Sequence, residues 1–83
     1  MPLTESEGKV LLALIEKDPI PIMSLPESAQ MGGNAVYNAI RKLLEKELVT
    51  ERREEKPPRK RLIGLTENGK RVAELLRQIE REL

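Results

Sequence analysis

Two consecutive prolines, Pro57 and Pro58, interrupt a strongly basic stretch in the second half of the chain. Proline fixes its own φ angle and has no amide proton, so this stretch cannot continue a helix. The runs on either side, residues 48–53 and 61–65, hold the β-branched and apolar residues that are common in strands. The sequence therefore predicts a β-hairpin whose projecting tip is formed by residues 56–59.

Positive charge is concentrated in this hairpin. The whole chain has 15 Lys and Arg against 14 Asp and Glu, a net charge of +1. Residues 52–61 carry a net charge of +4, whereas residues 1–51 sum to −3 and residues 62–83 to zero. The hairpin is thus suited to an anionic partner. The alternative is a charged surface hairpin whose basic residues pair with Glu54 and Glu55 and protect an exposed strand edge.

The N-terminal part of the chain predicts one helix and one short strand. Thr4 and Glu7 have the spacing of a capping box, and the helix should run to about Lys17. The Asp18-Pro19 pair ends it, because proline disfavours helical backbone in the residue before it. Residues 20–22 fit a lone strand added to the edge of the hairpin.

The next segment predicts two helices joined by a tight turn. Ser24 is expected to cap a short helix that ends near Gln30, and residues 31–33 form a turn in which glycine can take a positive φ. Asn34 is expected to cap a third helix over residues 35–47, which gives a helix-turn-helix arrangement. The apolar stripe of this helix is Val36, Ala39, Ile40, Leu43 and Leu44, and its polar face is Asn34, Tyr37, Asn38, Arg41 and Glu45.

Thr66 is expected to cap a last helix that runs from Glu67 to near the C-terminus. Val72, Leu75 and Leu76 should serve the core of the domain. Leu76, Ile79 and Leu83 continue a coiled-coil spacing, and the last two lie too far along the helix for so small a body to cover. We expect them to pair with a second copy, although burial against the first helix of the same chain is the alternative.

Together these elements predict one α+β, mostly helical domain over residues 1–83. The expected order is helix, strand, helix, helix, strand, strand, helix, with a core over about 4–66 and the C-terminal helix at 67–83. A chain this short has a limited core, which a second subunit would supplement. Charged residues make up 35% of the chain with nearly equal signs, as in the surface ion pairs of thermophilic proteins, although an ordinary soluble helical surface has the same composition.

Several classes of function are excluded. The chain has no cysteine and no histidine, which removes thiolate nucleophiles and the commonest metal ligands and general bases. Gly32 and Gly33 lack the lysine and the spacing of a phosphate-binding loop. We therefore expect no enzymatic activity, cofactor or metal, and no small-molecule ligand is evident. No membrane span or signal peptide is recognisable, so we expect a cytoplasmic protein.

The order of elements resembles the winged helix-turn-helix transcription factors, in particular the MarR/PadR-like group. Residues 34–53, NAVYNAIRKLLEKELVTERR, are similar to the recognition helix of that group and the strand after it. Residues 65–70, LTENGK, are similar to the L-T-x-x-G motif that follows the wing. The match spans roughly residues 4–70. The tip has a proline pair where the group has an acidic-arginine tip, and typical MarR proteins are longer, with dimer-forming helices at both ends.

The resemblance implies a protein that binds double-stranded DNA, expected to be a transcriptional regulator and a homodimer. Helix 34–47 would enter the major groove, and the basic wing 52–61 would contact the backbone or the minor groove. The helix residues expected to reach DNA are Asn34, Tyr37, Asn38, Arg41 and Lys42. Those expected in the wing are Arg52, Arg53, Lys56, Arg59, Lys60 and Arg61. The alternatives are a winged-helix protein-interaction module of a larger assembly, or a non-specific architectural DNA-binding protein.

Overall fold

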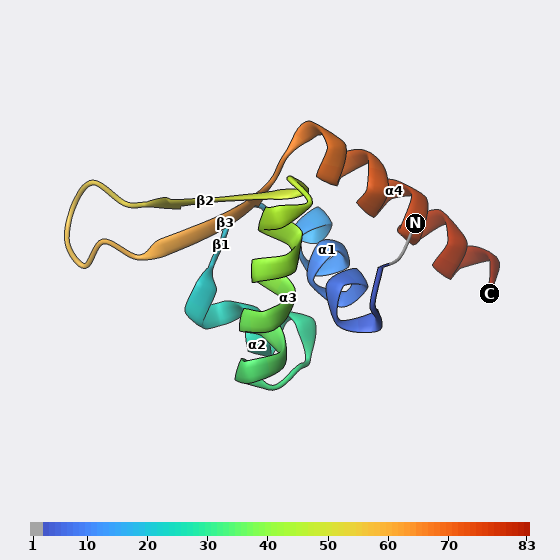
Figure 1. Cartoon of the computed structure of the whole chain (residues 1–83), viewed down its shortest axis with the longest axis horizontal. Coiled ribbons are helices and arrows are strands. Elements are labelled where there is room, and N and C mark those ends of the chain that lie inside the picture. The colour runs from blue at the N-terminus through green and yellow to red at the C-terminus, as the bar shows by residue number, and fades with distance from the viewer. Residues whose placement is uncertain (1–2) are drawn as a thin grey trace.

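The computed structural model describes residues 3–83, which form four α-helices, one 3-10 helix and a three-stranded antiparallel sheet (Figure 1). In chain order these are α1 (Glu5–Glu16), β1 (Ile20–Pro21), η1 (Ile22–Ser24), α2 (Leu25–Ala29), α3 (Gly33–Glu45), β2 (Val49–Arg53), β3 (Arg61–Leu65) and α4 (Glu67–Glu82). The predicted fold class and order of elements are confirmed, with the short η1 added between β1 and α2.

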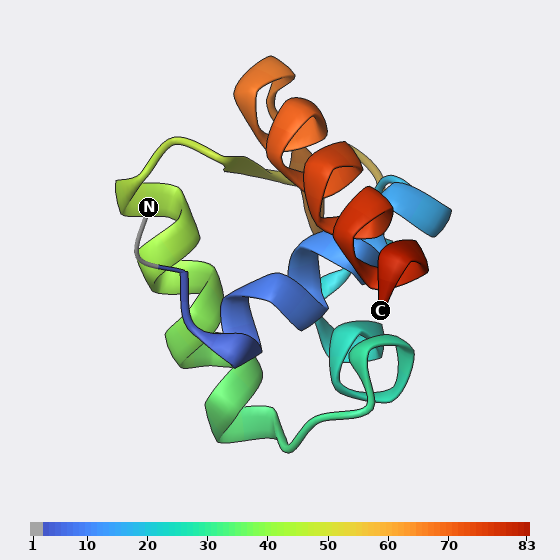
Figure 2. The same cartoon turned by 90° about the vertical axis from the view of Figure 1, so that its right-hand side faces the viewer.

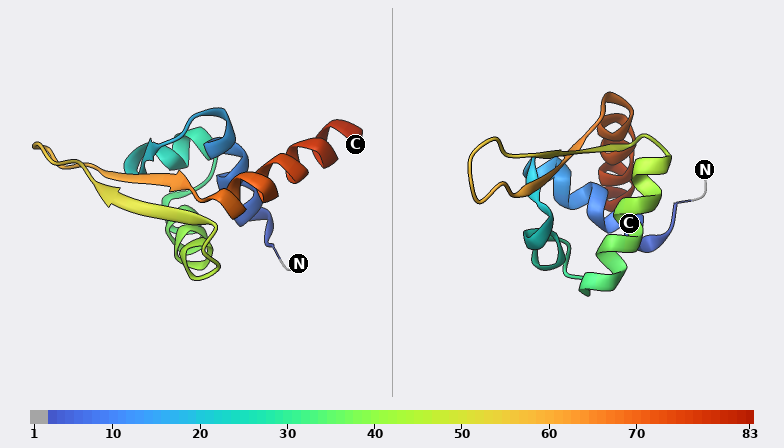
Figure 3. Two further views of the ribbon diagram at one scale, coloured as in Figure 1. Left: turned by 90° about the horizontal axis from the view of Figure 1, so that it is seen from above. Right: turned by 60° about the vertical axis from the view of Figure 1, so that its left-hand side comes forward.

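The molecule is elongated, with principal extents of 42 × 26 × 22 Å. β2, β3 and their connecting loop, here called the wing (residues 49–65), project from one end of the helical body, and α4 ends at the opposite end (Figures 1 and 3). Figure 2 shows α1 lying between α3 and α4, and it packs against both. The wing and the C-terminal end of α4 are therefore available to different partners.

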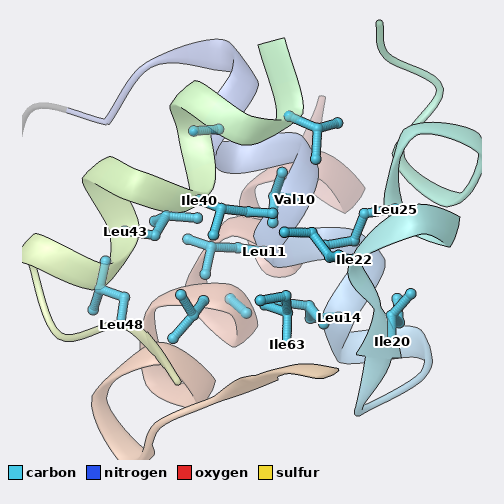
Figure 4. Packing of buried hydrophobic residues seen from close by; sticks show 14 residues of the cluster. Val10, Leu11, Leu14, Ile20, Ile22, Leu25, Ile40, Leu43, Leu48 and Ile63 are labelled. Carbon is cyan, nitrogen blue, oxygen red and sulfur yellow. The ribbon is translucent and has the colours of Figure 1, made fainter. Parts of the chain in front are cut away.

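One hydrophobic core holds the helices to the sheet (Figure 4). Val10, Leu11 and Leu14 project from α1 and are fully buried. They meet fully buried residues of the other elements, Leu25, Val36, Leu43 and Ile63. Each large side chain removed from water in this way contributes about 1.5–3 kcal/mol to folding. This core fixes α3 and the base of the wing against the same helix, α1.

The predicted capping signals of α1 and α4 are confirmed. The Glu7 amide donates to Thr4 Oγ1 at 3.1 Å, and the Thr4 amide donates to Glu7 Oε1 at 3.0 Å, so both halves of the capping box are present. At the start of α4 the Gly69 amide donates to Thr66 Oγ1 at 2.9 Å. These bonds satisfy amides that a helix start otherwise leaves unpaired.

The predicted cap of α3 is wrong, and the predicted cap of α2 has the right position but makes no capping bond. Asn34 lies inside α3, which begins one residue earlier, after the extended backbone of Gly32. Ser24 precedes α2, but its backbone is already helical (φ −91°, ψ −12°) and its side chain makes no capping bond. A capping side chain needs the extended backbone of a helix entry, and η1 runs directly into α2 instead.

The residues with positive φ angles also differ from the glycines that the sequence indicates. None of the described glycines has a positive φ, whereas Gln30 adopts 56° at the end of α2 and Glu47 adopts 58° after α3. The left-handed residue at 47 turns the chain into β2, so α3 ends at Glu45 instead of at 47. Leu44, predicted on the apolar stripe of α3, is 37% exposed.

The sheet has the order β1-β3-β2. Ile20 pairs with Ile63, which confirms the lone strand at the edge of the hairpin, although the strand covers residues 20–21 and Ile22 begins η1. The wing itself pairs from Val49 opposite Leu65 out to Arg53 opposite Arg61. This register decides which face of the wing each basic residue occupies.

The N-terminus of α4 is fixed to the junction between α3 and β2. Thr66 Oγ1 donates to the Glu47 carbonyl at 2.8 Å, and the Thr66 amide donates to the Leu48 carbonyl at 3.1 Å. A Cβ atom at Gly69 would lie 1.9 Å from the Leu48 carbonyl oxygen. The glycine of the L-T-x-x-G motif is thus required by close packing of one backbone on another.

α4 divides its apolar side chains between the core and the surface. Ala73 is buried, and Val72 and Leu76 pack against the core. Leu75, predicted to serve the core, is 59% exposed, and Ile79 and Leu83 are 56% and 96% exposed. These three side chains, here called the α4 apolar row, follow one another at intervals of four residues along the helix. Over the part of the chain that the structure describes, no helix is long and apolar enough to cross a membrane.

Candidate nucleic-acid interface

The outward face of α3 carries the polar residues that the sequence indicates. Asn34, Tyr37, Asn38, Arg41 and Lys42 are all exposed, while Val36, Ala39, Ile40 and Leu43 hold the helix on the core. Arg41 Nη2 donates to Asn38 Oδ1 at 3.2 Å, one turn away on the same face. The two side chains therefore present their donors and acceptors as a pair.

The strand register settles the orientation of the wing residues, which the sequence left open. Arg53 lies directly opposite Arg61, and Glu51 lies opposite Ile63. Because side chains alternate along a strand, these four share one face, and Ile63 shows that it is the face that continues into the core. Arg52 pairs with Leu62 and lies on the other face.

The tip of the wing is a structured loop. The Glu54 amide donates to the Lys60 carbonyl at 3.1 Å, and the Lys60 amide donates to Glu54 Oε1 at 3.1 Å. The Arg59 amide donates to the Lys56 carbonyl at 2.9 Å, and Arg59 has a positive φ of 55°. This turn holds Lys56, Arg59 and Lys60 beyond the end of the strands, where all three are exposed.

A groove of about 610 Å³ runs between the wing, α3 and the β1–η1 segment. Its lining residues are Pro21, Ile22, Met23, Ser24, Tyr37, Arg53, Pro58, Arg59, Lys60 and Arg61. The structure thus brings Tyr37 of the predicted reading helix together with four of the six predicted wing residues. Asn34, Asn38, Arg41 and Lys42 lie outside the groove on α3, and Arg52 and Lys56 lie outside it on the wing.

Sequence reasoning missed one residue that lines this groove and one that bonds to its lining. Met23 is a largely exposed apolar side chain that lines the groove together with Tyr37, and no role was predicted for it between the strand expected at 20–22 and the cap expected at Ser24. Glu51 was counted only as part of a strand, although Arg61 Nη2 donates to Glu51 Oε1 at 2.6 Å. The alternation of side chains along β2 places Glu51 and Arg53 on one face, but only the register adds Arg61 of β3 to that face.

Glu51 also determines the electrostatics of this part of the wing. The hydrogen bond from Arg61 and the negative charge of Glu51 raise the pKa of Arg61 above its ordinary value. Arg61 Nε is buried and has no hydrogen-bond partner. The guanidinium is therefore held by one carboxylate and keeps unused donor capacity.

Among residues 3–83, no group of three or more His, Cys, Asp or Glu is placed to hold a metal ion. The groove instead offers cations around apolar side chains, which suits a polyanion with apolar sugar surfaces.

No protein-family model and no curated protein matched the chain by sequence. Solved structures do match it. A mutant of Lactococcus lactis ZitR has a TM-score of 0.89 at 27% identity over 99% of this chain. A mutant of S. aureus MepR gives 0.84 at 26% identity over 96% of this chain. A MarR family transcriptional regulator from Silicibacter pomeroyi gives 0.79 at 26% identity over 96% of this chain.

This is the winged-helix fold of MarR-family regulators. The resemblance predicted from residues 34–53 and 65–70 is confirmed by these neighbours. They are transcription regulators and not enzymes, in agreement with the expectation that the chain has no enzymatic activity. The chain spans 56% of ZitR, 60% of MepR and 56% of the Silicibacter pomeroyi regulator, and so corresponds to a little over half of each MarR-family neighbour.

Proposed function

We propose that the chain binds double-stranded DNA as part of a transcriptional regulator, with α3 in the major groove and the wing on the backbone or in the minor groove. One observation carries the proposal. Tyr37 of α3 lines the same groove as Arg53 and Arg61 of the wing. A duplex placed against the polar face of α3 would therefore also meet the basic residues of the wing. The MarR-family neighbours support the same type of partner.

The chemistry of α3 suits base reading. Asparagine can pair with adenine through two hydrogen bonds, and arginine with guanine. Asn38 and Arg41 are exposed and already bonded to each other, so the reading unit would be the pair. Tyr37 can donate its hydroxyl to a phosphate or pack on a sugar, and it stands where α3 meets the wing.

The wing suits sequence-independent binding. Arg53, Arg59, Lys60 and Arg61 gather around one groove, and Lys56 extends the positive charge to the tip. Each phosphate that such a side chain neutralises releases condensed counterions, so the affinity should fall steeply as salt rises. The wing would supply most of the affinity, and α3 would supply the sequence preference.

We also propose that two copies associate through α4. Leu75, Ile79 and Leu83 run from the middle of α4 to its C-terminus, and α4 ends at the end of the molecule remote from the wing (Figure 3), so pairing there leaves α3 and the wing free for DNA. Leu76 was predicted in this interface, but it packs against its own core, and Leu75 takes its place in the proposal. A symmetric pair would present two recognition helices to two half-sites.

Selection of binding sites from random duplexes tests the proposal. The wild-type chain should enrich a short sequence, whereas Asn38→Ala and Arg41→Ala should lose the preference while keeping affinity for random duplexes. Arg59→Ala should weaken binding to all sequences alike. Lys17→Ala, an exposed lysine outside the groove, serves as the control.

Two outcomes would favour the alternatives. No binding to any duplex at low salt would exclude the DNA proposal and favour an interaction module whose wing contacts an acidic partner. Equal affinity for selected and random duplexes would instead indicate a non-specific architectural protein.

A further inference from the structure

Glu51 is an acidic side chain on the basic face of the wing. It lies two residues before Arg53 on β2 and opposite Ile63 on β3, so it points to the same side as Arg53 and Arg61. Its Oε1 accepts the bond from Arg61 Nη2 at 2.6 Å. The side chains of Arg61 and Glu51 are 39% and 29% exposed, so a ligand in the adjoining groove can reach the pair from solvent.

A carboxylate and a phosphate compete for the same arginine donors. The planar guanidinium binds both anions through its N–H groups in similar geometry. In this structure Arg61 lines the groove together with Arg53, Arg59 and Lys60, yet the acceptor that holds its guanidinium is the carboxylate of Glu51. A duplex that reaches the groove would have to replace that carboxylate or leave Arg61 in place.

We propose that Glu51 is an intramolecular competitor of DNA phosphate at Arg61, and that it lowers the affinity of the wing for any duplex. This inference rests on the proposed function. If Arg61 turns to a phosphate, Glu51 loses its partner and stands next to a second negative charge. If Arg61 stays with Glu51, the wing neutralises one phosphate fewer.

In either case the wing loses binding free energy that is independent of the DNA sequence. The base contacts of α3 are untouched, because Glu51 lies outside α3 and its bond is to Arg61. A larger share of the remaining binding free energy then comes from α3. Glu51 thus increases the share of the binding free energy that comes from the base contacts of α3.

The wing offers a matched control for this role. Glu55 lies in the same loop region and is exposed, and within the described residues it makes no hydrogen bond or ion pair. Glu54 is less suitable, because its carboxylate accepts the backbone amide of Lys60 and so helps to shape the tip. Glu51→Gln and Glu55→Gln remove the same charge from the same wing, but only the first removes the carboxylate that holds Arg61.

The experiment measures binding of a fluorescent duplex of random sequence, ~20 base pairs or about two helical turns long. Fluorescence anisotropy gives the affinity at several salt concentrations. Glu51→Gln should bind about three- to tenfold more tightly than wild type at low salt, and the slope of log K against log salt should steepen by about 0.9, the value for one further phosphate. Glu55→Gln should leave the slope unchanged. In an Arg61→Gln background, Glu51→Gln should no longer steepen it.

The controls separate this inference from the proposed function. Binding of the wild-type chain reports on the proposed function, and its complete absence at low salt would overturn both. If the wild type binds but Glu51→Gln and Glu55→Gln give the same affinity and slope, the competitor role of Glu51 is excluded while DNA binding stands. The same holds if Glu51→Gln acts equally with and without Arg61. Circular dichroism melts of each variant confirm that only folded protein is compared.

Discussion

Arg53 of β2 and Arg61 of β3 lie directly opposite each other in the wing, on the face that continues outward from the core. Val49, Ile63 and Leu65 form the inner part of that face, and basic side chains replace them where the hairpin leaves the helical body. Neighbouring Arg52 lies on the opposite face. The consecutive residues Arg52 and Arg53 thus lie on opposite faces of the wing.

Arg53→Ala and Arg52→Ala should therefore differ in DNA affinity. Arg53 lines the groove shared with Tyr37, so its loss should weaken binding to a random duplex and reduce the salt slope by about 0.9, as for one lost phosphate contact. Arg52→Ala removes the same charge from the adjacent position and should have the smaller effect on both quantities. Anisotropy titrations at several salt concentrations measure them. An equal loss for the two variants would argue against a DNA-binding face on the Tyr37 side.

The orientation of these arginines could not be read from the sequence alone. The proline pair and the flanking apolar runs predicted the hairpin, because proline restricts the backbone locally. Which face each arginine occupies depends on strand register, and register is set by the pairing of Val49 with Leu65 and by the core that both residues join. One residue of slippage would exchange Arg52 and Arg53.

Helix boundaries were likewise predicted correctly only where the signal for them is local in the sequence. Thr4 and Thr66 cap their helices through bonds within four residues, so sequence spacing was sufficient to predict them. The start of α3 was misplaced because Gly32 enters the helix directly and Asn34 is carried into the first turn. Met23 joined the groove only because β1 pairs with β3, where Ile20 lies opposite Ile63, and no local pattern carries that information.

Gly69→Ala should destabilise the fold severely. The new Cβ atom would lie 1.9 Å from the Leu48 carbonyl oxygen, which belongs to the backbone and cannot turn aside. Separation of α4 from the α3–β2 junction should cost about 3 kcal/mol in the free energy of unfolding. Gly33→Ala is the matched control, since it is also a helical glycine and a Cβ there meets nothing within 4 Å.

Gly33→Ala should stabilise the protein by about 0.5 kcal/mol, because alanine has the higher helix propensity. Urea denaturation followed by circular dichroism measures both variants. Similar midpoints for Gly69→Ala and wild type would show that α4 does not pack this closely on Leu48 in solution.

The stability of the fold should fall in acid through one ion pair. Glu7 is fully buried, and its Oε2 accepts a bond from Lys46 Nζ at 2.5 Å. Burial alone would raise the pKa of Glu7, but the bonds from Lys46 and Thr4 outweigh burial and hold the pKa below its ordinary value of 4.5. The pair joins the start of α1 to the end of α3.

A carboxyl group whose pKa is lowered by folding stabilises the protein above its unfolded pKa, and loses that contribution as the pH falls through the folded pKa. The free energy of unfolding of the wild type should thus decline from near pH 4.5 downward. Glu7→Gln keeps the capping-box geometry but carries no charge, so it should be less stable by about 1–2 kcal/mol at pH 7 and should converge on wild type in acid. Urea titrations between about pH 3 and pH 7 give both curves. A constant difference across that range would mean that Glu7 is not ionised in the pair.

The two faces of α4 should respond differently to substitution. Leu76 packs against the core, so Leu76→Ala should lower the free energy of unfolding by about 2 kcal/mol at concentrations where the chain is monomeric. Leu75 is exposed in a single copy, so Leu75→Ala should leave monomer stability nearly unchanged. Its effect should instead fall on association, because Leu75 belongs to the α4 apolar row.

Ile79→Glu tests association directly. The substitution places a charge in the middle of the α4 apolar row, where a second copy would bury it without a partner, so sedimentation should show a shift from dimer to monomer. Lys70→Gln makes the same change in net charge at an exposed position on the opposite side of α4 and should leave the oligomeric state unchanged. If DNA is bound by two copies, Ile79→Glu should also weaken binding to a site with two half-sites far more than binding to one half-site, since only the former gains from the linkage of two recognition helices. A wild-type chain that sediments as a monomer at every concentration would remove α4 as the dimer contact and leave DNA binding by a single copy to be tested by the α3 and wing variants.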